Sequence, residues 1–246
     1  MAEVERIQKV LAAQGVGSRR QIEQMIREGR IMVGNDPAEL GQKISAEDRV
    51  FVDGKQIRLR DQEKRVPRVI LFHKDEGQLC SRKASERSES IFESLPRLRN
   101  ARWCMVGRLD VNTSGLILFT TSGELANKLA HPSSEIEREY AVRVFGEVEQ
   151  SHIKAMMAGV EDKGERLKFD SVRFQGGEGK NSWYHVTLRT GKNREVRRLW
   201  ASQGFTISRL IRVRFGHFLL PPRLKKKKYQ ELERDEVKRL IKSLQK

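Results

Sequence analysis

The sequence predicts an α+β protein with two domains: a small N-terminal domain and a larger one built on a mixed or antiparallel sheet. The first sixty residues combine two short helical patterns with a few strand signals, whereas the rest of the chain is dominated by strand-like segments separated by short helices. Between the two, residues 58–68 are mostly charged, which is typical of a linker. We therefore expect domains over residues 1–60 and 68–232, a linker over 61–67, and a basic C-terminal helix or tail over 233–246.

The small domain is expected to hold two helices and a small sheet. Ile7, Val10 and Leu11 recur at helical spacing, and Ser18 followed by Gln21 fits a capping box that opens a second helix. Strand patterns follow over residues 31–33 and 50–52. Basic side chains fall largely off the apolar positions and form either a binding face or an ordinary solvated one: Lys9, Arg19, Arg20, Arg27 and Arg30.

In the larger domain, the alternation of residues 138–145 predicts a strand with Tyr140, Val142 and Val144 on one side. A tyrosine on such an apolar face is more often core packing than chemistry. Other strand and helix patterns fall over residues 69–72, 102–106, 116–119, 123–130, 183–189 and 210–215.

The charge of the chain indicates a polyanionic partner. The formal net charge is +16 and the isoelectric point is about 10.1, which favours nucleic acid or an acidic membrane surface. The membrane alternative is weak, because no apolar run approaches the roughly 18 residues needed to span a bilayer. Scattered histidines and the absence of glycine-rich nucleotide motifs predict neither a metal nor a cofactor. The two cysteines fit a reducing cytoplasm.

Asp110 lies in a polar break between two apolar runs, between Gly107 and Gly115 and two residues after Arg108. A lone aspartate in this position is often a turn residue that binds its own backbone. The glycines also allow the backbone to approach a bound group closely. The segment is therefore either a turn or a candidate site.

Residues 192–201 have helical spacing, with Val196, Leu199 and Trp200 on one face. Arg194 and Arg198 point away from that face, where they could meet phosphates. Arg197 lies at its border, where an arginine can pack its stem on the core and pair with a buried carboxylate. The alternative is that all three arginines form a solvated face.

Two family resemblances follow from these motifs. Residues 6–11, 18–20 and 29–33 resemble the S4 domain, a small αL-type RNA-binding module. The segments Gly107–Thr120, Arg138–Tyr140 and Gly191–Trp200 resemble the bacterial ribosomal RNA pseudouridine synthases that carry an S4 domain. One departure is visible, because the family's Lys-Pro-x-Gly is Lys74-Asp75-Glu76-Gly77 in this chain.

The resemblance implies an isomerase that converts a uridine of 23S ribosomal RNA to pseudouridine, most similar to the members that modify position 2605. It places the essential aspartate at Asp110, the active-site tyrosine at Tyr140 and the aspartate-pairing arginine at Arg197. Ionised Asp110 is expected to be shielded from water, with Arg197 lowering its pKa. RNA contacts are expected from Arg108, Lys192, Arg194 and Arg198 and from the basic residues of the S4 domain.

The implied enzyme needs no cofactor or metal, acts as a cytoplasmic monomer on a flipped uridine in an RNA stem-loop, and does not bind a membrane. Three alternatives remain open: a non-catalytic S4-type RNA-binding or ribosome assembly factor, a synthase acting on another 23S or 16S uridine, and an RNA methyltransferase with an attached S4 domain.

Overall fold

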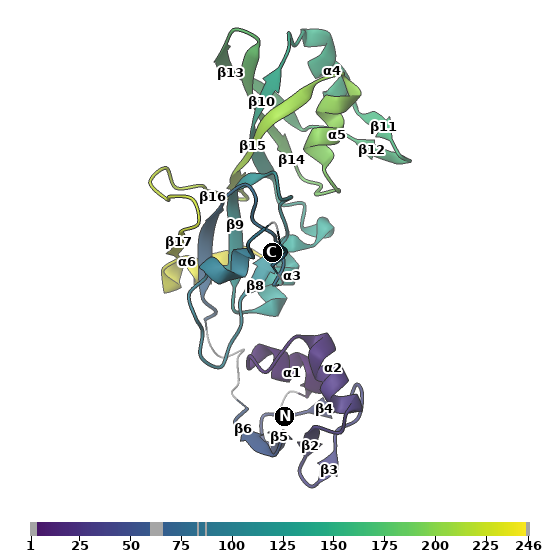
Figure 1. Cartoon of the computed structure of the whole chain (residues 1–246), viewed down its shortest axis with the longest axis vertical. Coiled ribbons are helices and arrows are strands. Elements are labelled where there is room, and N and C mark those ends of the chain that lie inside the picture. The colour runs from purple at the N-terminus through teal and green to yellow at the C-terminus, as the bar shows by residue number, and fades with distance from the viewer. Residues whose placement is uncertain (1–3, 60–65, 83, 87, 245–246) are drawn as a thin grey trace.

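The computed structural model describes residues 4–59, 66–82, 84–86 and 88–244, and of Glu178 only the backbone. The predicted linker, residues 61–67, lies mostly outside this range. The small N-terminal domain is at one end of an elongated molecule, and the large sheet occupies the middle and the other end (Figure 1).

The N-terminal domain forms because two amphipathic helices cover a small sheet. Helix α1 spans Ile7–Ala13 and α2 spans Arg19–Arg27. The predicted capping box is confirmed, since Gln21 N donates to Ser18 Oγ at 3.2 Å and Ser18 N donates to Gln21 Oε1 at 2.8 Å. The strands form a sheet in the order β3-β2-β5-β6 and a separate β1–β4 pair: β1 Glu5–Arg6, β2 Ile31–Val33, β3 Asp36–Pro37, β4 Lys43–Ile44, β5 Val50–Val52 and β6 Lys55–Ile57.

The large domain is built on a mixed sheet whose main path, in the described residues, runs β13-β14-β10-β15-β9-β7-β17. Neighbours are antiparallel except β15 and β9, which are parallel. Strand β16 joins β15, and β8 joins β9. The bounds are β7 Val69–Lys74, β8 Cys104–Val106, β9 Ser114–Thr120, β10 Arg138–Phe145, β13 Ser171–Glu178, β14 Asn181–Leu188, β15 Thr206–Phe215, β16 Phe218–Leu219 and β17 Tyr229–Glu231.

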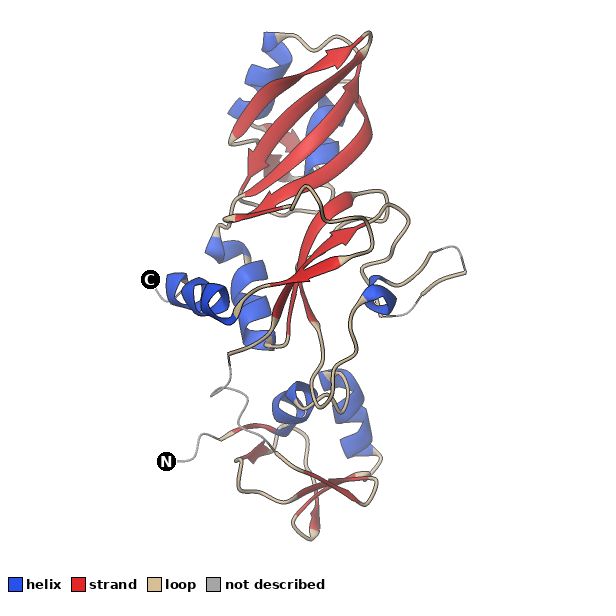
Figure 2. Ribbon diagram, turned by 90° about the vertical axis from the view of Figure 1, so that its left-hand side faces the viewer, coloured by secondary structure: helices blue, strands red, loops and turns tan. Residues whose placement is uncertain are grey.

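Short helices cover both halves of the sheet (Figure 2). Val106, Leu116 and Leu125 form one core with α3, while Val142, Val186 and Trp200 form another beneath α4 and α5. The helices are η1 Ile91–Ser94, α3 Gly123–Ala130, η2 Pro132–Ser134, α4 Gln150–Ala158, α5 Glu195–Ser202 and α6 Arg234–Ser243, and a β11–β12 hairpin spans Val160–Asp162 and Glu165–Leu167.

The parallel seam between β9 and β15 is unusually close. A Cβ added to Gly115 would lie 2.3 Å from the carbonyl oxygen of Arg212, and the φ of Gly115 is +108°. Only glycine fits this contact, because any side chain would collide with the backbone of β15. The seam brings the start of β9, just after the Asp110 loop, against Arg212.

The C-terminal segment forms a helix, α6, which is one of the two forms predicted for it. Val237 and Leu240 of α6 are buried in the same core as Val69 and Leu71 of β7. The apolar stripe of this helix therefore packs on the large domain.

The N-terminal domain also contacts the segment that leads into β8. Arg102 Nη1 donates to the carbonyl oxygen of Gly17 at 2.7 Å. A Cβ on Gly15, whose φ is +84°, would come within 2.9 Å of Ala101. The turn between α1 and α2 thus packs directly on the residues that precede β8, the strand that leads to the Asp110 loop.

Candidate active site

Asp110, Tyr140 and Arg197 line one cavity of about 850 Å³, although they are far apart in the sequence. Asp110 comes from the loop between β8 and β9, Tyr140 from β10, and Arg197 from α5. The parallel β9–β15 pair and the antiparallel β15–β10 pair bring the three segments together.

The Asp110 loop is held in place by neighbouring backbone and sulfur atoms. Thr113 N donates to the Asp110 carbonyl oxygen at 3.1 Å, which closes the turn. Leu109 N donates to Cys80 Sγ at 3.4 Å, and Gly77 N donates to the Val111 carbonyl oxygen at 2.8 Å. The loop is therefore a fixed platform for the carboxylate.

Lys74, at the end of β7, adds a buried cation beneath this loop. Its side chain is fully buried, and Nζ donates to the carbonyl oxygens of Thr113, Val111 and Asp75 at 2.8, 3.2 and 2.9 Å. Burial lowers the pKa of Lys74, and nearby acidic groups, Asp110 among them, oppose that shift. In the turn after Lys74, where the family has proline, Asp75 N donates to Gln78 Oε1 at 3.0 Å, and Lys226 Nζ lies 2.7 Å from Asp75 Oδ1.

Arg197 holds the same loop from the other side. Its Nη2 donates to the Asn112 carbonyl oxygen at 2.7 Å and its Nη1 to that of Ile207 at 3.3 Å. Burial lowers the pKa of Arg197, as does the charge of Arg194, while Asp110 acts in the opposite direction. The predicted ion pair between Arg197 and Asp110 is thus replaced by a bond to the backbone of the Asp110 loop.

Arg194 lies within ion-pair distance of Asp110. Its Nη1 is 3.9 Å from Asp110 Oδ2. The prediction missed this because α5 begins at Glu195, so that helical spacing does not apply to Arg194. Arg194 instead precedes the helix with a φ of +50°, a conformation that non-glycine residues rarely adopt and that turns its side chain into the cavity.

The Asp110 side chain is 35% exposed in the free protein. The sequence led us to expect a carboxylate shielded from water. The cavity is instead open, so exclusion of water from Asp110 requires another molecule to cover it.

Tyr140 lies where the strand alternation placed it. Strand β10 has the predicted bounds, Val142 and Val144 are fully buried, and Tyr140 packs at the edge of the same core. Tyr140 also lines the cavity. Its ring therefore combines core packing with access to the space beside Asp110.

The predicted RNA contacts divide into two groups. Arg108 and Arg194 are exposed and Lys192 is half-buried, and all three line the cavity. Arg198 does not line it: its Nη1 is 2.6 Å from Glu165 Oε2, and its Nε pairs with Asp162. In the free protein Arg198 is thus paired with two carboxylates of the β11–β12 hairpin, and its role as a phosphate ligand stays a prediction.

The basic residues of the N-terminal domain divide similarly. Arg19, Arg20 and Arg27 are exposed on α2. Arg30 instead forms two hydrogen bonds with Asp53, at 2.7 and 2.8 Å, and Lys9 pairs with Glu5. The exposed α2 arginines are therefore the better candidates for binding a polyanion.

Two buried arginines that line the cavity were missed. Arg138 is 7% exposed and Arg212 is 2% exposed. Their signal in the sequence is a cation within an apolar strand pattern, as in Leu210–Phe215. Burying a charged side chain at such a position costs free energy, so a charge there indicates a structural or functional role.

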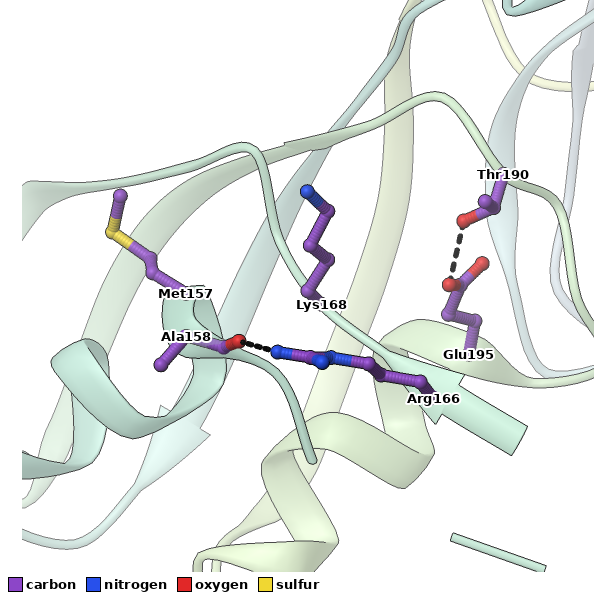
Figure 3. A pocket seen from close by; sticks show the side chains of 6 residues that line it. All are labelled: Met157, Ala158, Arg166, Lys168, Thr190 and Glu195. Carbon is purple, nitrogen blue, oxygen red and sulfur yellow. Dashed lines mark hydrogen bonds between the residues drawn. The ribbon is translucent and has the colours of Figure 1, made fainter. Parts of the chain in front are cut away.

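A smaller pocket of about 310 Å³ adjoins the cavity (Figure 3). The two share Thr190 and Glu195, and the small pocket is also lined by Met157, Ala158, Arg166 and Lys168. Buried Glu195 accepts hydrogen bonds from Thr190 Oγ1 at 2.6 Å and from Lys192 N at 3.1 Å. The Glu195 carboxylate therefore fixes the loop of residues 190–192, between the cavity and the small pocket.

Within the described residues, no group of three or more His, Cys, Asp or Glu side chains is arranged to hold a metal ion. In the same part of the chain, every helix is too short or too polar to cross a bilayer.

The fold and the cavity define the class of protein. The family model for RNA pseudouridylate synthase matches residues 68–202, and the S4 domain model matches residues 5–50. The chain therefore belongs to the RNA pseudouridylate synthase family, a family of isomerases, and it carries an S4 domain.

Several proteins are similar to this chain over most of its length. The "Ribosomal large subunit pseudouridine synthase B" of Yersinia pestis is 48% identical over 231 residues, which cover 93% of this chain and 73% of the relative. Proteins of the same name from Haemophilus influenzae and Escherichia coli K12 are each 49% identical, over 96% and 93% of this chain and 67% and 79% of the relative. A solved structure described as "Crystal structure of pseudouridylate synthase" shares the fold, with a TM-score of 0.65, 23% identity and coverage of 96% of this chain and 99% of the other.

Proposed function

We propose that this chain converts one uridine of 23S ribosomal RNA, at position 2605, to pseudouridine. The observation that carries this proposal is the meeting of Asp110, Tyr140 and Arg197 in one cation-rich cavity. The names of relatives that are about 49% identical over most of the chain support a substrate in the large ribosomal subunit. A ribosomal substrate also favours the bacterial cytoplasm as the place of action.

Asp110 is proposed to start the reaction. Its carboxylate either attacks C1′ of the ribose or removes the C2′ proton, and both routes break the N1–C1′ bond. The electron pair of that bond leaves with the uracil, which becomes an anion delocalised over its carbonyl groups. The base then turns and rejoins C1′ through C5; C5 loses its proton, N1 gains one, and in the second route Asp110 returns the proton to C2′. The isomerisation adds and removes no atoms, so that one carboxylate and its electrostatic surroundings can suffice.

The neighbours of Asp110 are proposed to supply position and charge. Arg197 and Lys74 fix the carbonyl groups of residues 111–113, so that the carboxylate is held in one orientation. Arg194 places a positive charge 3.9 Å from the Asp110 carboxylate. Tyr140 offers a ring on which the uracil can stack and a hydroxyl that can help to move the C5 proton.

RNA is proposed to close the open cavity. The target uridine must leave its stack, which costs a few kcal/mol. Arg108, Lys192 and Arg194 lie where they can hold the flanking phosphates. The exposed arginines of α2 extend the contact to a second RNA segment, and the S4 domain family supports this role. We also propose that the enzyme acts as a monomer, because Asp110, Tyr140 and Arg197 meet within one chain.

The decisive experiment maps pseudouridines in 23S and 16S ribosomal RNA from cells that lack this protein. We expect the pseudouridine at position 2605 of 23S ribosomal RNA to be lost, and to be restored by the wild-type gene and not by Asp110→Asn. The purified Asp110→Asn variant should still bind the RNA stem-loop. Loss of a 16S site, or restoration of the 23S site by Asp110→Asn, would contradict the proposal.

A further inference from the structure

Arg212 is a buried cation that lines the catalytic cavity without a carboxylate within 4.0 Å in the described part of the chain. Its Nε donates to the Leu116 carbonyl oxygen at 2.6 Å, and its guanidinium lies 5.3 Å from the centre of the Phe215 ring. Its Nη2 is buried and has no hydrogen-bond partner among the described residues. Such a group is unfavourable in the free protein, because it has lost its water without gaining a partner.

Arg138, a second buried arginine that lines the cavity, provides a comparison with Arg212. It also lies 5.3 Å from the Phe215 ring, and it is 7% exposed. Its Nη1 donates to the carbonyl oxygens of Ile136, Arg189 and Thr190, at 2.9, 2.6 and 2.9 Å. Backbone acceptors thus satisfy Arg138, while Arg212, which also lines the cavity, keeps one buried donor without a partner among the described residues.

We propose that Arg212 Nη2 donates a hydrogen bond to a carbonyl oxygen of the target uracil, O2 or O4, and stabilises the negative charge on the base after the N1–C1′ bond breaks. This inference rests on the proposed function of the cavity. Arg212 acts by hydrogen bonding and transfers no proton to the base. The electron pair that leaves with N1 spreads to O2 and O4, where a desolvated cation stabilises it most.

The position of Arg212 favours the base over a phosphate as its ligand. The exposed cations of the cavity, Arg108 and Arg194, suit phosphates, which remain part of a hydrated RNA backbone. The uracil, by contrast, must enter the cavity and turn within it, so that its carbonyl oxygens can reach a side chain that is only 2% exposed. A donor fixed by its Nε bond to Leu116 requires no reorganisation when the charge develops.

The test measures single-turnover rates on RNA stem-loops that carry uridine, 2-thiouridine or 4-thiouridine at the target position. Sulfur accepts a weaker hydrogen bond than oxygen, so we expect one of the two thio substitutions to slow the wild type. Arg212→Met should lower the rate on uridine by about 10²-fold and should no longer respond to that thio substitution. Binding of the RNA should change by less than about threefold, because Arg212 acts on charge that develops during the reaction.

Arg209→Met is the matched control, since Arg209 lies exposed on the same strand and does not line the cavity. It should keep the rate and the thio response of the wild type. Arg212→Lys retains a charge and a donor, and should recover part of the rate with an altered thio response. It also replaces Arg212→Met in the test if that variant does not fold.

Two results separate the possible failures. If both thio substitutions slow the Arg212 variants and the wild type by the same factors, Arg212 acts only through the β9–β15 seam and this inference is wrong. If the wild type converts no uridine in any 23S stem-loop, the proposed function itself fails.

Discussion

Arg197 Nη2 donates to the carbonyl oxygen of Asn112 at 2.7 Å, two residues beyond Asp110. Lys74 Nζ donates to the carbonyl oxygens on both sides of that one, at Val111 and Thr113. Three successive carbonyl groups that follow Asp110 are therefore held by two buried or half-buried cations. The carboxylate is positioned through its backbone, and its side chain stays available for a substrate.

Arg197→Met should affect catalysis more than RNA binding. Without the bond to Asn112 the loop can shift, and a misplacement of about 1 Å can lower a rate by about 10²-fold. We expect kcat to fall by about that factor while KM changes little. Steady-state assays with a 23S stem-loop check this, and an increase in KM with unchanged kcat would instead assign Arg197 to substrate binding.

Lys74→Met should change stability in a pH-dependent way. The pKa of Lys74 is lowered in the folded protein from its ordinary value of 10.5. Between the folded and the ordinary value the unfolded chain binds more protons than the native one, so Lys74 contributes more stability as pH rises through this window. The difference in unfolding free energy between wild type and Lys74→Met should therefore be larger at about pH 9.5 than at about pH 7.5.

Urea denaturation at the two pH values measures this difference, and groups that titrate alike in both proteins cancel from it. At the lower pH the variant should be less stable by about 1–3 kcal/mol, because carbonyl groups beneath the Asp110 loop lose their donor. A difference that shrinks as pH rises would contradict the assigned direction of the pKa shift.

The sequence was sufficient to predict features set by local patterns. The Ser18 capping box, the bounds of β10 and the apolar side of Tyr140 all follow from spacings of two to four residues. The family resemblance was needed to predict that Asp110, Tyr140 and Arg197 share one site. These residues lie far apart in the sequence, and the order of the strands in the sheet brings their segments together.

What the sequence did not reveal depends on long-range contacts and on local backbone departures. Arg194 was assigned a helical direction, yet it stands before α5 in a left-handed conformation. Arg198 was assigned to phosphates, yet its two carboxylate partners lie more than thirty residues away, in the β11–β12 hairpin. Helical periodicity predicts the face of the helix on which a residue lies. It does not predict which residues from a distant hairpin pack against that face.

Gly115→Ala should disrupt the seam between β9 and β15. The added methyl group would lie 2.3 Å from the Arg212 carbonyl oxygen, and the residue would keep an unfavourable φ of +108°. We expect a loss of more than about 3 kcal/mol of stability or failure to fold. Gly123→Ala is the control, because the nearest atom to its Cβ is Cys104 Sγ at 3.8 Å and alanine favours helix α3. Thermal unfolding compares the two, and a tolerated Gly115→Ala would refute the close contact.

Arg194→Gln and Arg198→Gln should differ in their effect on the salt dependence of RNA binding. If about six phosphates are neutralised, the affinity of the wild type falls by about 10³-fold between about 50 and 200 mM salt. Arg194 is 47% exposed and lines the cavity, so Arg194→Gln should reduce the slope of log K against log salt by about one.

Arg198→Gln should leave that slope unchanged, because the charge of Arg198 is already balanced by Asp162 and Glu165. It should instead lower the melting temperature, since the β11–β12 hairpin loses its attachment to α5. Fluorescence anisotropy with a labelled stem-loop at four salt concentrations measures both slopes. Equal reductions in the two variants would mean that Arg198 exchanges its carboxylate partners for phosphates when RNA binds, and would overturn the distinction that the free structure draws between the two arginines.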